Sequence, residues 1–131
     1  SNNGLNMFEE MQTASLLSKL HSQDPTSLPA VEVLAMATLR GARAIGMEQR
    51  IGSLETGKAA DVIAIDFSQP ETLPVFNPIS HLAYACNGSQ VSHSWINGQL
   101  VMQDRKLTQI DTQGLAERTR AWQKRIQDGA Q

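Results

Sequence analysis

The sequence predicts an α+β fold in which helices come first, a small antiparallel sheet follows and one helix closes the chain. Apolar residues recur every three to four positions up to Gly46, which is typical of helices facing a core. After Gly46 the period falls to two, in β-branched runs separated by turn residues. The chain has 131 residues, of which 40% are hydrophobic and 18% charged, so we expect one ordinary globular unit with a moderate core.

The first helix is predicted over residues 5–20. Its apolar stripe is broad enough to face a core on one side. The stripe consists of Met7, Met11, Ala14, Leu17 and Leu20. Asn6 is the expected N-cap, and Glu9 completes a start that resembles a capping box. Residues 22–27 form a loop, because Pro25 forbids continuation of the helix.

A second helical stretch is predicted over residues 29–45, with Pro29 in the first turn, where its missing N–H costs nothing. Gly41 weakens the middle of this stretch. We therefore expect two short helices, or one kinked helix, with the break near Thr38. Gly46 has the position of the glycine that ends a helix.

Four strands are predicted, over residues 61–66, 91–96, 99–103 and 107–110. The β-branched run at 61–66 is expected to be largely buried. Asn97-Gly98 is the strongest hairpin signal in the chain. A second turn is expected at residues 104–106.

The remaining segments are a loop and a helix. Residues 67–89 contain three prolines and are expected to be mostly loop, with one or two helical turns at 79–85. The last helix is predicted over 112–127, with Asp111 as its N-cap and Gly129 at its end. One face of this helix carries Leu115, Thr119, Trp122 and Ile126. Its charged residues form a solvated outer face.

Composition excludes several classes of function. The 11 basic and 13 acidic residues give a net charge of −2, so no basic excess is available to bind nucleic acid. No apolar run approaches the roughly 18 residues of a membrane span. The only cysteine, Cys86, rules out an internal disulfide framework and is expected to be a small buried side chain. The first residues lack a basic start and an apolar core, so a cytoplasmic protein is expected, with its natural start upstream or removed.

No metal site is predicted from this chain alone. His21, His81 and His93 lie in no ligand spacing and have no cluster of Cys or carboxylates beside them. His21 is expected in the last turn of the first helix, His81 as a packed or hydrogen-bonded loop residue, and His93 on one face of a strand.

Residues 52–58 match the phosphate-loop pattern G-x-x-x-x-G-K. Ala59 follows where a Ser or Thr would bind magnesium, and a strand follows where a helix should begin. We therefore interpret the segment as a turn entering the strand. Nucleotide binding remains a weaker alternative.

Three stretches carry a resemblance to a known family. They read SNNGLNMFEEM at residues 1–11, MATLRGARAIG at 36–46 and IGSLETGKAADVIAID at 51–66. In order and spacing they resemble the C-terminal third of the metal-dependent amidohydrolases. The branch is that of triazine hydrolases and methylthioadenosine/S-adenosylhomocysteine deaminases. The resemblance covers essentially the whole chain.

The resemblance implies a position for each part. Residues 1–46 would be the last outer helices that complete a (β/α)₈ barrel, 47–111 the C-terminal strands of a small β-sandwich, and 112–131 a terminal helix. In this family the barrel holds zinc or a similar divalent ion, whose bound hydroxide attacks an aromatic ring carbon and expels ammonia or chloride. The family's metal ligands are absent from this sequence, so the resemblance implies no catalytic residue and no metal ligand here.

Three residues remain as candidates for a site. By the resemblance, Ser1, Asn2 and Asn3 follow the eighth strand, at the catalytic mouth of the barrel. They would bind substrate there, or alternatively form a capping turn for the following helix.

Two hypotheses about function result. The first is the C-terminal segment of an amidohydrolase that removes an amino or chloro group from a heteroaromatic ring, in the first place an adenosine-type deaminase. The second is a truncated, non-catalytic module for oligomerisation or binding. The expected partners are the remainder of the barrel and a second copy in a homo-oligomer, with no nucleic acid and no membrane.

Overall fold

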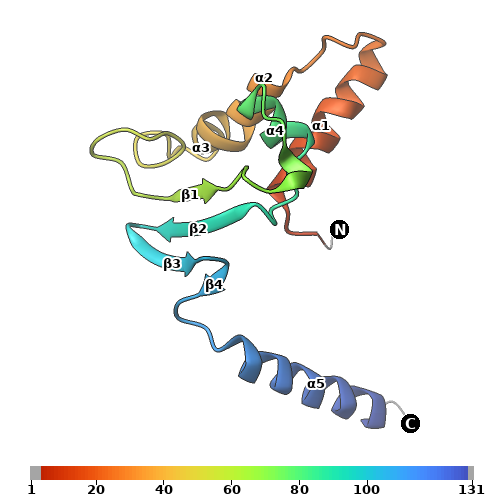
Figure 1. Cartoon of the computed structure of the whole chain (residues 1–131), viewed down its shortest axis with the longest axis vertical. Coiled ribbons are helices and arrows are strands. Elements are labelled where there is room, and N and C mark those ends of the chain that lie inside the picture. The colour runs from red at the N-terminus through yellow and green to blue at the C-terminus, as the bar shows by residue number, and fades with distance from the viewer. Residues whose placement is uncertain (1–3, 130–131) are drawn as a thin grey trace.

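The computed structural model describes residues 4–129. Its elements run in the order helices, sheet, helix, which confirms the α+β layout (Figure 1). They are α1 (Met7–Ser22), α2 (Ala30–Ala35), the π-helical η1 (Met36–Arg40), α3 (Gly41–Ala44), β1 (Val62–Ile65), the 3₁₀ turn η2 (Pro70–Thr72), α4 (Pro78–Tyr84), β2 (Val91–Ile96), β3 (Gln99–Gln103), β4 (Lys106–Leu107) and α5 (Thr112–Gly129).

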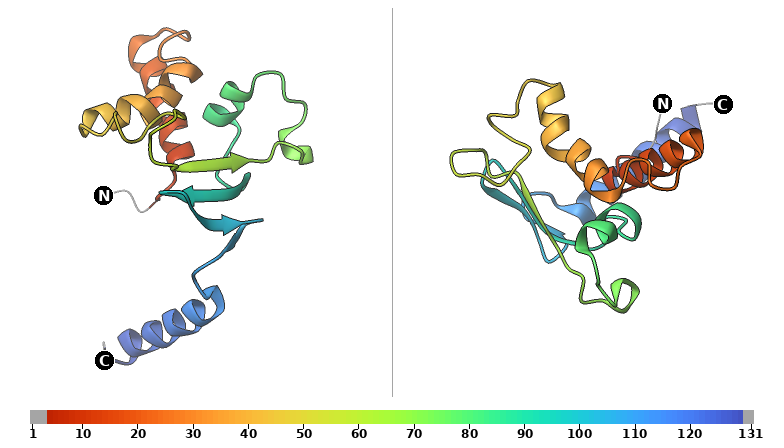
Figure 2. Two further views of the ribbon diagram at one scale, coloured as in Figure 1. Left: turned by 90° about the vertical axis from the view of Figure 1, so that its left-hand side faces the viewer. Right: turned by 90° about the horizontal axis from the view of Figure 1, so that it is seen from above.

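The core lies where α1, α2 and α4 meet. Each of these helices supplies one buried apolar side chain, namely Met11, Val33 and Ala83. Half-buried neighbours surround them, including Phe8, Leu28 and Tyr84. In Figures 1 and 2 this helical cluster lies beside the β1 edge of the sheet, and α5 lies beyond β4 at the opposite edge. The helices therefore flank the sheet at its edges.

The first helix is confirmed, two residues later along the chain than predicted. Asn6 is its N-cap. Of the apolar stripe, Met11 is buried, whereas Met7, Leu17 and Leu20 are exposed. Within this chain the stripe faces the core only around Met11, because α2 and α4 cover only the middle of α1.

The break near Thr38 is confirmed and has a specific form. The helix widens to π-helical hydrogen bonding over η1 before α3 resumes. A Cβ on Gly41 would lie 2.8 Å from the carbonyl oxygen of Met36, so the wide turn needs glycine there. Gly46, with φ +68°, ends α3 as predicted. Its N–H donates to Arg43 at 3.1 Å and the next N–H, of Met47, donates to Ala42 at 2.8 Å, which is a Schellman motif.

The four strands form one antiparallel sheet in the order β1-β2-β3-β4. The Asn97-Gly98 hairpin is confirmed, and both residues have the positive φ of a type I′ turn. Asp104 and Arg105 also have positive φ and form a second two-residue turn. The last strand therefore occupies Lys106–Leu107 rather than residues 107–110.

Burial of the first strand was predicted wrongly. No residue of the four strands is buried, and 48% of Ile63 is exposed. The helical cluster lies at the edge of the sheet, so nothing in the described chain covers its faces completely.

Two helices, α4 and α5, begin at a residue whose side chain caps the first turn. Residues 67–89 contain the two-turn helix α4, which begins where the Asn77 side chain accepts a hydrogen bond from the N–H of Ser80 at 3.2 Å. Asp111 caps α5 by accepting from Gly114 at 3.0 Å, as predicted. The structure extends α5 to Gly129. Within the described residues, no helix is both long and apolar enough to cross a bilayer.

Candidate functional site

The predicted substrate-binding residues Ser1, Asn2 and Asn3 lie outside the described residues. The chain that follows them is anchored by Asn6. The Asn6 side-chain oxygen accepts from the N–H of Phe8 at 3.2 Å, and its amide nitrogen donates to Glu9 Oε1 at 2.9 Å. The same nitrogen donates to the carbonyl oxygen of Asn87 at 3.1 Å. The segment leading from the candidate site is thus tied to the loop that precedes β2.

The Glu9 contact differs from the predicted one. In a capping box, the carboxylate reaches the backbone N–H of the N-cap residue. Here the Glu9 carboxylate accepts from the Asn6 side chain instead. Glu9 therefore orients the amide that bonds to Asn87.

A polar cluster that sequence reasoning missed lies inside the helical core. Ser15 is fully buried, its hydroxyl donates to the Leu28 carbonyl at 2.8 Å, and the Tyr84 hydroxyl lies 2.8 Å away. Lys19 Nζ donates to Ser15 Oγ at 3.0 Å and to the Ser27 carbonyl at 2.5 Å. The only signal in the sequence was a serine one helical turn after Met11, on the buried side of the helix.

The chemistry of this cluster is structural. A serine next to a lysine can serve as an activated nucleophile when substrate reaches it. Ser15 has no exposed surface, and Lys19 is held by main-chain carbonyl groups. The cluster therefore fastens α1 to the start of α2 and to α4.

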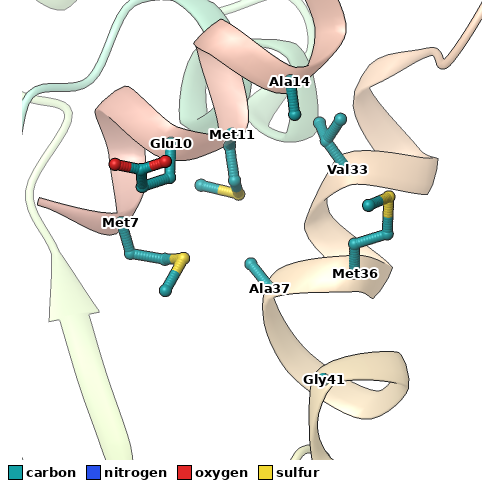
Figure 3. Close-up of a pocket in the computed structure, with 8 residues that line it drawn as sticks. All are labelled: Met7, Glu10, Met11, Ala14, Val33, Met36, Ala37 and Gly41. Atoms are coloured by element: carbon teal, nitrogen blue, oxygen red, sulfur yellow. The ribbon is translucent and has the colours of Figure 1, made fainter. Parts of the chain in front are cut away.

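An apolar cavity of about 310 Å³ opens between α1 and the α2-η1 segment. Figure 3 shows Met7 and Met11 on one wall and Val33, Met36 and Ala37 on the other. Among the described residues, Glu10 is the only charged one that lines it. Flexible methionines adapt to varied apolar shapes, so this cavity suits packing of apolar side chains more than recognition of a polar substrate.

Residues 51–66 make contacts that support the fold. Gly52 has φ +92°, and a Cβ there would lie 2.7 Å from the Cβ of Ala42 in α3. The Asp61 carboxylate accepts from the N–H of Asn97 at 2.7 Å, which ties the start of β1 to the hairpin. Residues 51–66 therefore approach α3 closely at Gly52 and bond to the β2–β3 hairpin at Asp61.

Lys58 does not have the environment of a phosphate-loop lysine. Its Nζ donates to Ser53 Oγ at 2.6 Å and lies 3.4 Å from Glu55 Oε1. The Ser53 hydroxyl donates to Glu55 at 2.6 Å. This hydrogen bond, followed by the charge of Lys58, lowers the pKa of the Glu55 carboxyl. The segment is a turn that leads into β1, as the sequence predicted.

The histidines have local partners. His81 lies in α4 and not in a loop, which corrects the prediction. Its two ring nitrogens lie 3.2 Å and 2.9 Å from the carbonyl oxygens of Asn77 and Thr72, which confirms the hydrogen-bonded alternative. His93 stacks on Trp95, with ring centroids 5.7 Å apart, and its Nε2 lies 3.7 Å from Asp104 Oδ1. His21 lies in the last turn of α1.

Metal-binding and thiol chemistry find no support in residues 4–129. Within that range, no three His, Cys, Asp or Glu side chains form a group able to hold a metal ion. Cys86 is buried, as predicted, and burial raises the pKa of its thiol.

Known proteins resemble this chain closely. The model of the amidohydrolase family matches residues 1–101. A 5-methylthioadenosine/S-adenosylhomocysteine deaminase from Syntrophobacter fumaroxidans is 51% identical over 120 residues, which is 92% of this chain and 27% of the relative. A 5'-deoxyadenosine deaminase from Methanosarcina mazei is 46% identical over 117 residues, 89% of this chain and 27% of the relative.

Solved structures also resemble this chain. An adenosine deaminase from Xanthomonas campestris with bound zinc superposes with a TM-score of 0.92 at 44% identity, over 98% of this chain and 29% of that one. A mutant of the atrazine chlorohydrolase of Arthrobacter aurescens, complexed with zinc and atraton, gives a TM-score of 0.72 at 26% identity, over 85% of this chain and 25% of that one. The chain thus spans between 25% and 29% of the length of these relatives. The resemblance seen in the sequence is confirmed, and this chain belongs to the amidohydrolase family.

Proposed function

We propose that this chain is the C-terminal part of a longer zinc-dependent hydrolase that removes the amino group from an adenosine-type nucleoside. The superposition on a zinc-containing adenosine deaminase, over 98% of this chain, carries the proposal. Relatives named as 5-methylthioadenosine/S-adenosylhomocysteine and 5'-deoxyadenosine deaminases support the nucleoside as substrate class. Zinc supplies the acidity that turns a bound water into a nucleophile near neutral pH.

The described residues do not fit the zinc ion themselves. Residues 4–129 offer no group of three metal-ligating side chains, and the three histidines lie in separate places. No chemical step is therefore assigned to them. We propose that residues 4–129 support the active site from outside. The helical cluster and the sheet hold in place a catalytic portion that lies earlier in the longer protein.

The exposed apolar face of α1 is the proposed contact with that portion. Leu17 and Leu20 are exposed on it, and the methionine-lined cavity opens beside Met7. Apolar surface left open in this way marks an interface. We propose that the remainder of the barrel covers it, with Ser1, Asn2 and Asn3 leading out of the catalytic mouth. Assembly into a homo-oligomer stays a prediction.

The test is an assay of the longer protein that contains this chain. We expect ammonia release from 5-methylthioadenosine or S-adenosylhomocysteine, loss of that activity on treatment with a chelator, and recovery when zinc is restored. A chlorinated triazine distinguishes the dechlorinating branch. Ammonia release that persists after complete metal removal, or none from any adenosine-type nucleoside, contradicts the proposal.

The isolated 131-residue chain serves as the control. We expect it to bind no stoichiometric zinc and to release no ammonia. A one-to-one zinc content by elemental analysis would place a metal site within this chain and overturn the supporting role.

A further inference from the structure

Two Asn-Gly pairs in the described chain share a chemical reactivity that the proposed function does not use. Asparagine is a labile residue, and glycine after it removes the Cβ that would hinder attack on its side chain by the next backbone nitrogen. The pairs are Asn87-Gly88, in the loop before β2, and Asn97-Gly98, in the β2–β3 hairpin. A third pair, Asn3-Gly4, begins outside the described residues. Both described asparagines are exposed, so water reaches them.

The reaction joins the backbone nitrogen of the glycine to the side-chain carbon Cγ of the asparagine. The N–Cγ bond closes a cyclic imide while the Cγ–Nδ2 bond breaks. The glycine N–H passes its proton, through water, to the departing nitrogen, which leaves as ammonia. Water then opens the imide at either carbonyl and leaves aspartate or isoaspartate, without any oxidant or reductant. The glycine N–H is the attacking group, so a hydrogen bond that it donates opposes the reaction.

The hairpin pair is restrained by its hydrogen bonds. The Gly98 N–H donates to the Ala60 carbonyl at 3.1 Å, and the Asn97 N–H donates to Asp61 Oδ1 at 2.7 Å. Both residues of the pair also have the positive φ of a tight turn. Before the Gly98 nitrogen can attack, its bond to Ala60 must break and the end of the hairpin must open.

The loop pair lacks this restraint on the attacking nitrogen. Among the described residues, no acceptor bonds to the Gly88 N–H. The Asn87 side-chain oxygen Oδ1 accepts from the Ser89 N–H at 3.0 Å, and the Asn87 N–H donates to Gln90 Oε1 at 3.2 Å. The Ser89 N–H therefore faces the oxygen on which negative charge builds during attack, and a donor in that position stabilises the charge.

We propose that Asn87 is a site of spontaneous deamidation in the folded protein, whereas Asn97 is protected although glycine follows it too. This inference goes beyond the proposed function and does not depend on it. The co-reactant is water.

The product changes a contact that links distant parts of the chain. The Asn87 carbonyl accepts from the Asn6 amide at 3.1 Å, and the same amide nitrogen donates to Glu9 Oε1 at 2.9 Å. Isoaspartate lengthens the backbone at this point by a carbon atom. Either product also adds a negative charge to the loop that shares the Asn6 amide with Glu9. Deamidation therefore weakens the link between the start of α1 and this loop.

The experiment measures conversion of both asparagines in the longer protein that contains this chain. The folded protein is incubated in warm, mildly alkaline buffer and digested at intervals. Mass spectrometry of the peptides detects replacement of the amide NH2 by OH, and chromatography separates isoaspartate from aspartate. We expect Asn87 to convert about fivefold faster than Asn97 or more, since one net hydrogen bond corresponds to a ratio of this size.

The same incubation in denaturant is the internal control. Neither glycine N–H is held by the fold there, so the two rates should become similar. Equal rates in the folded protein, or a faster rate at Asn97, overturn the proposal. A difference of the same size in denaturant also overturns it, because the flanking sequence and not the fold is then the cause.

Two variants test the physical cause and the consequence. Asp61→Ala removes the acceptor of the Asn97 N–H and loosens the hairpin, so conversion of Asn97 should rise while that of Asn87 stays unchanged. An unchanged Asn97 rate contradicts the restraint, and the comparison in denaturant does not depend on the folding of this variant. Asn87→Gln keeps the carbonyl that Asn6 contacts but forms the larger imide ring far more slowly. After incubation, amide hydrogen exchange of residues 7–10 should accelerate in the wild type and not in Asn87→Gln, and equal exchange in both refutes the weakened link.

Discussion

The side-chain amide of Asn6 donates a hydrogen bond to the carbonyl oxygen of Asn87, 81 residues later in the chain, at 3.1 Å. The same side chain caps α1 through the N–H of Phe8. Asn6 thus makes one hydrogen bond within the first turn of α1 and one to a loop that is distant in the sequence. This bond links the start of α1 to the loop that precedes β2, an inner strand of the sheet.

Two substitutions separate the tasks of Asn6. Asn6→Ala removes the cap and the link to Asn87, and we expect it to lower the free energy of unfolding of the full-length protein by about 1–2 kcal/mol. Asn6→Asp keeps the acceptor for Phe8 but replaces the donor with an oxygen that faces the Glu9 carboxylate. Urea unfolding at neutral pH measures both. Equal stability of Asn6→Ala and wild type would show that neither contact contributes.

The Ser15 cluster predicts a larger effect than an exposed serine. Ser15→Ala leaves Lys19 and the Tyr84 hydroxyl without their shared partner in the core, so we expect a loss of about 1–3 kcal/mol in unfolding free energy. Ser22→Ala is the control on the same helix, because the Ser22 hydroxyl bonds to Ser18 at the exposed surface. We expect that control to stay within about 0.5 kcal/mol of wild type. Similar values for the two variants would contradict the burial of the cluster.

Alanine substitutions at Gly52 and Gly57 separate the stability cost of a steric clash from that of backbone strain. Both have φ above +90°, but a Cβ on Gly52 meets Ala42 at 2.7 Å, whereas a Cβ on Gly57 meets nothing within 4 Å. We expect Gly57→Ala to cost about 1 kcal/mol and Gly52→Ala to cost clearly more. Thermal unfolding of both variants makes the comparison. Partial recovery in the double variant Gly52→Ala/Ala42→Gly would assign the excess to this contact.

Glu55 makes stability depend on acid pH in a defined direction. The Ser53 hydroxyl, and then Lys58, lower the pKa of the folded carboxyl below that of the unfolded chain. The contribution is therefore present above the ordinary glutamate pKa of about 4.3 and is lost as the pH falls through the folded value. An NMR titration should show the Glu55 pKa rising toward the ordinary value in Ser53→Ala. An unchanged titration midpoint would remove the hydroxyl as its main cause.

The sequence alone was sufficient wherever the signal is local. Asn6, Asp111 and Asn97-Gly98 were assigned correctly, because caps and tight turns depend on a few consecutive residues. The break at Thr38 and the stop at Gly46 follow from the same backbone preferences. Family membership was also readable, since the three motifs lie within continuous stretches.

Only the tertiary structure could decide burial. Leu17 and Ile63 have apolar neighbours at the right spacing, yet both are exposed, because burial depends on what packs against a face and not on the face itself. Ser15 shows the converse: a polar residue on an apolar helix became fully buried once Leu28 and Tyr84 supplied hydrogen-bonding partners. Period and turn chemistry therefore determined the elements, and the arrangement of distant segments determined which of their faces became core.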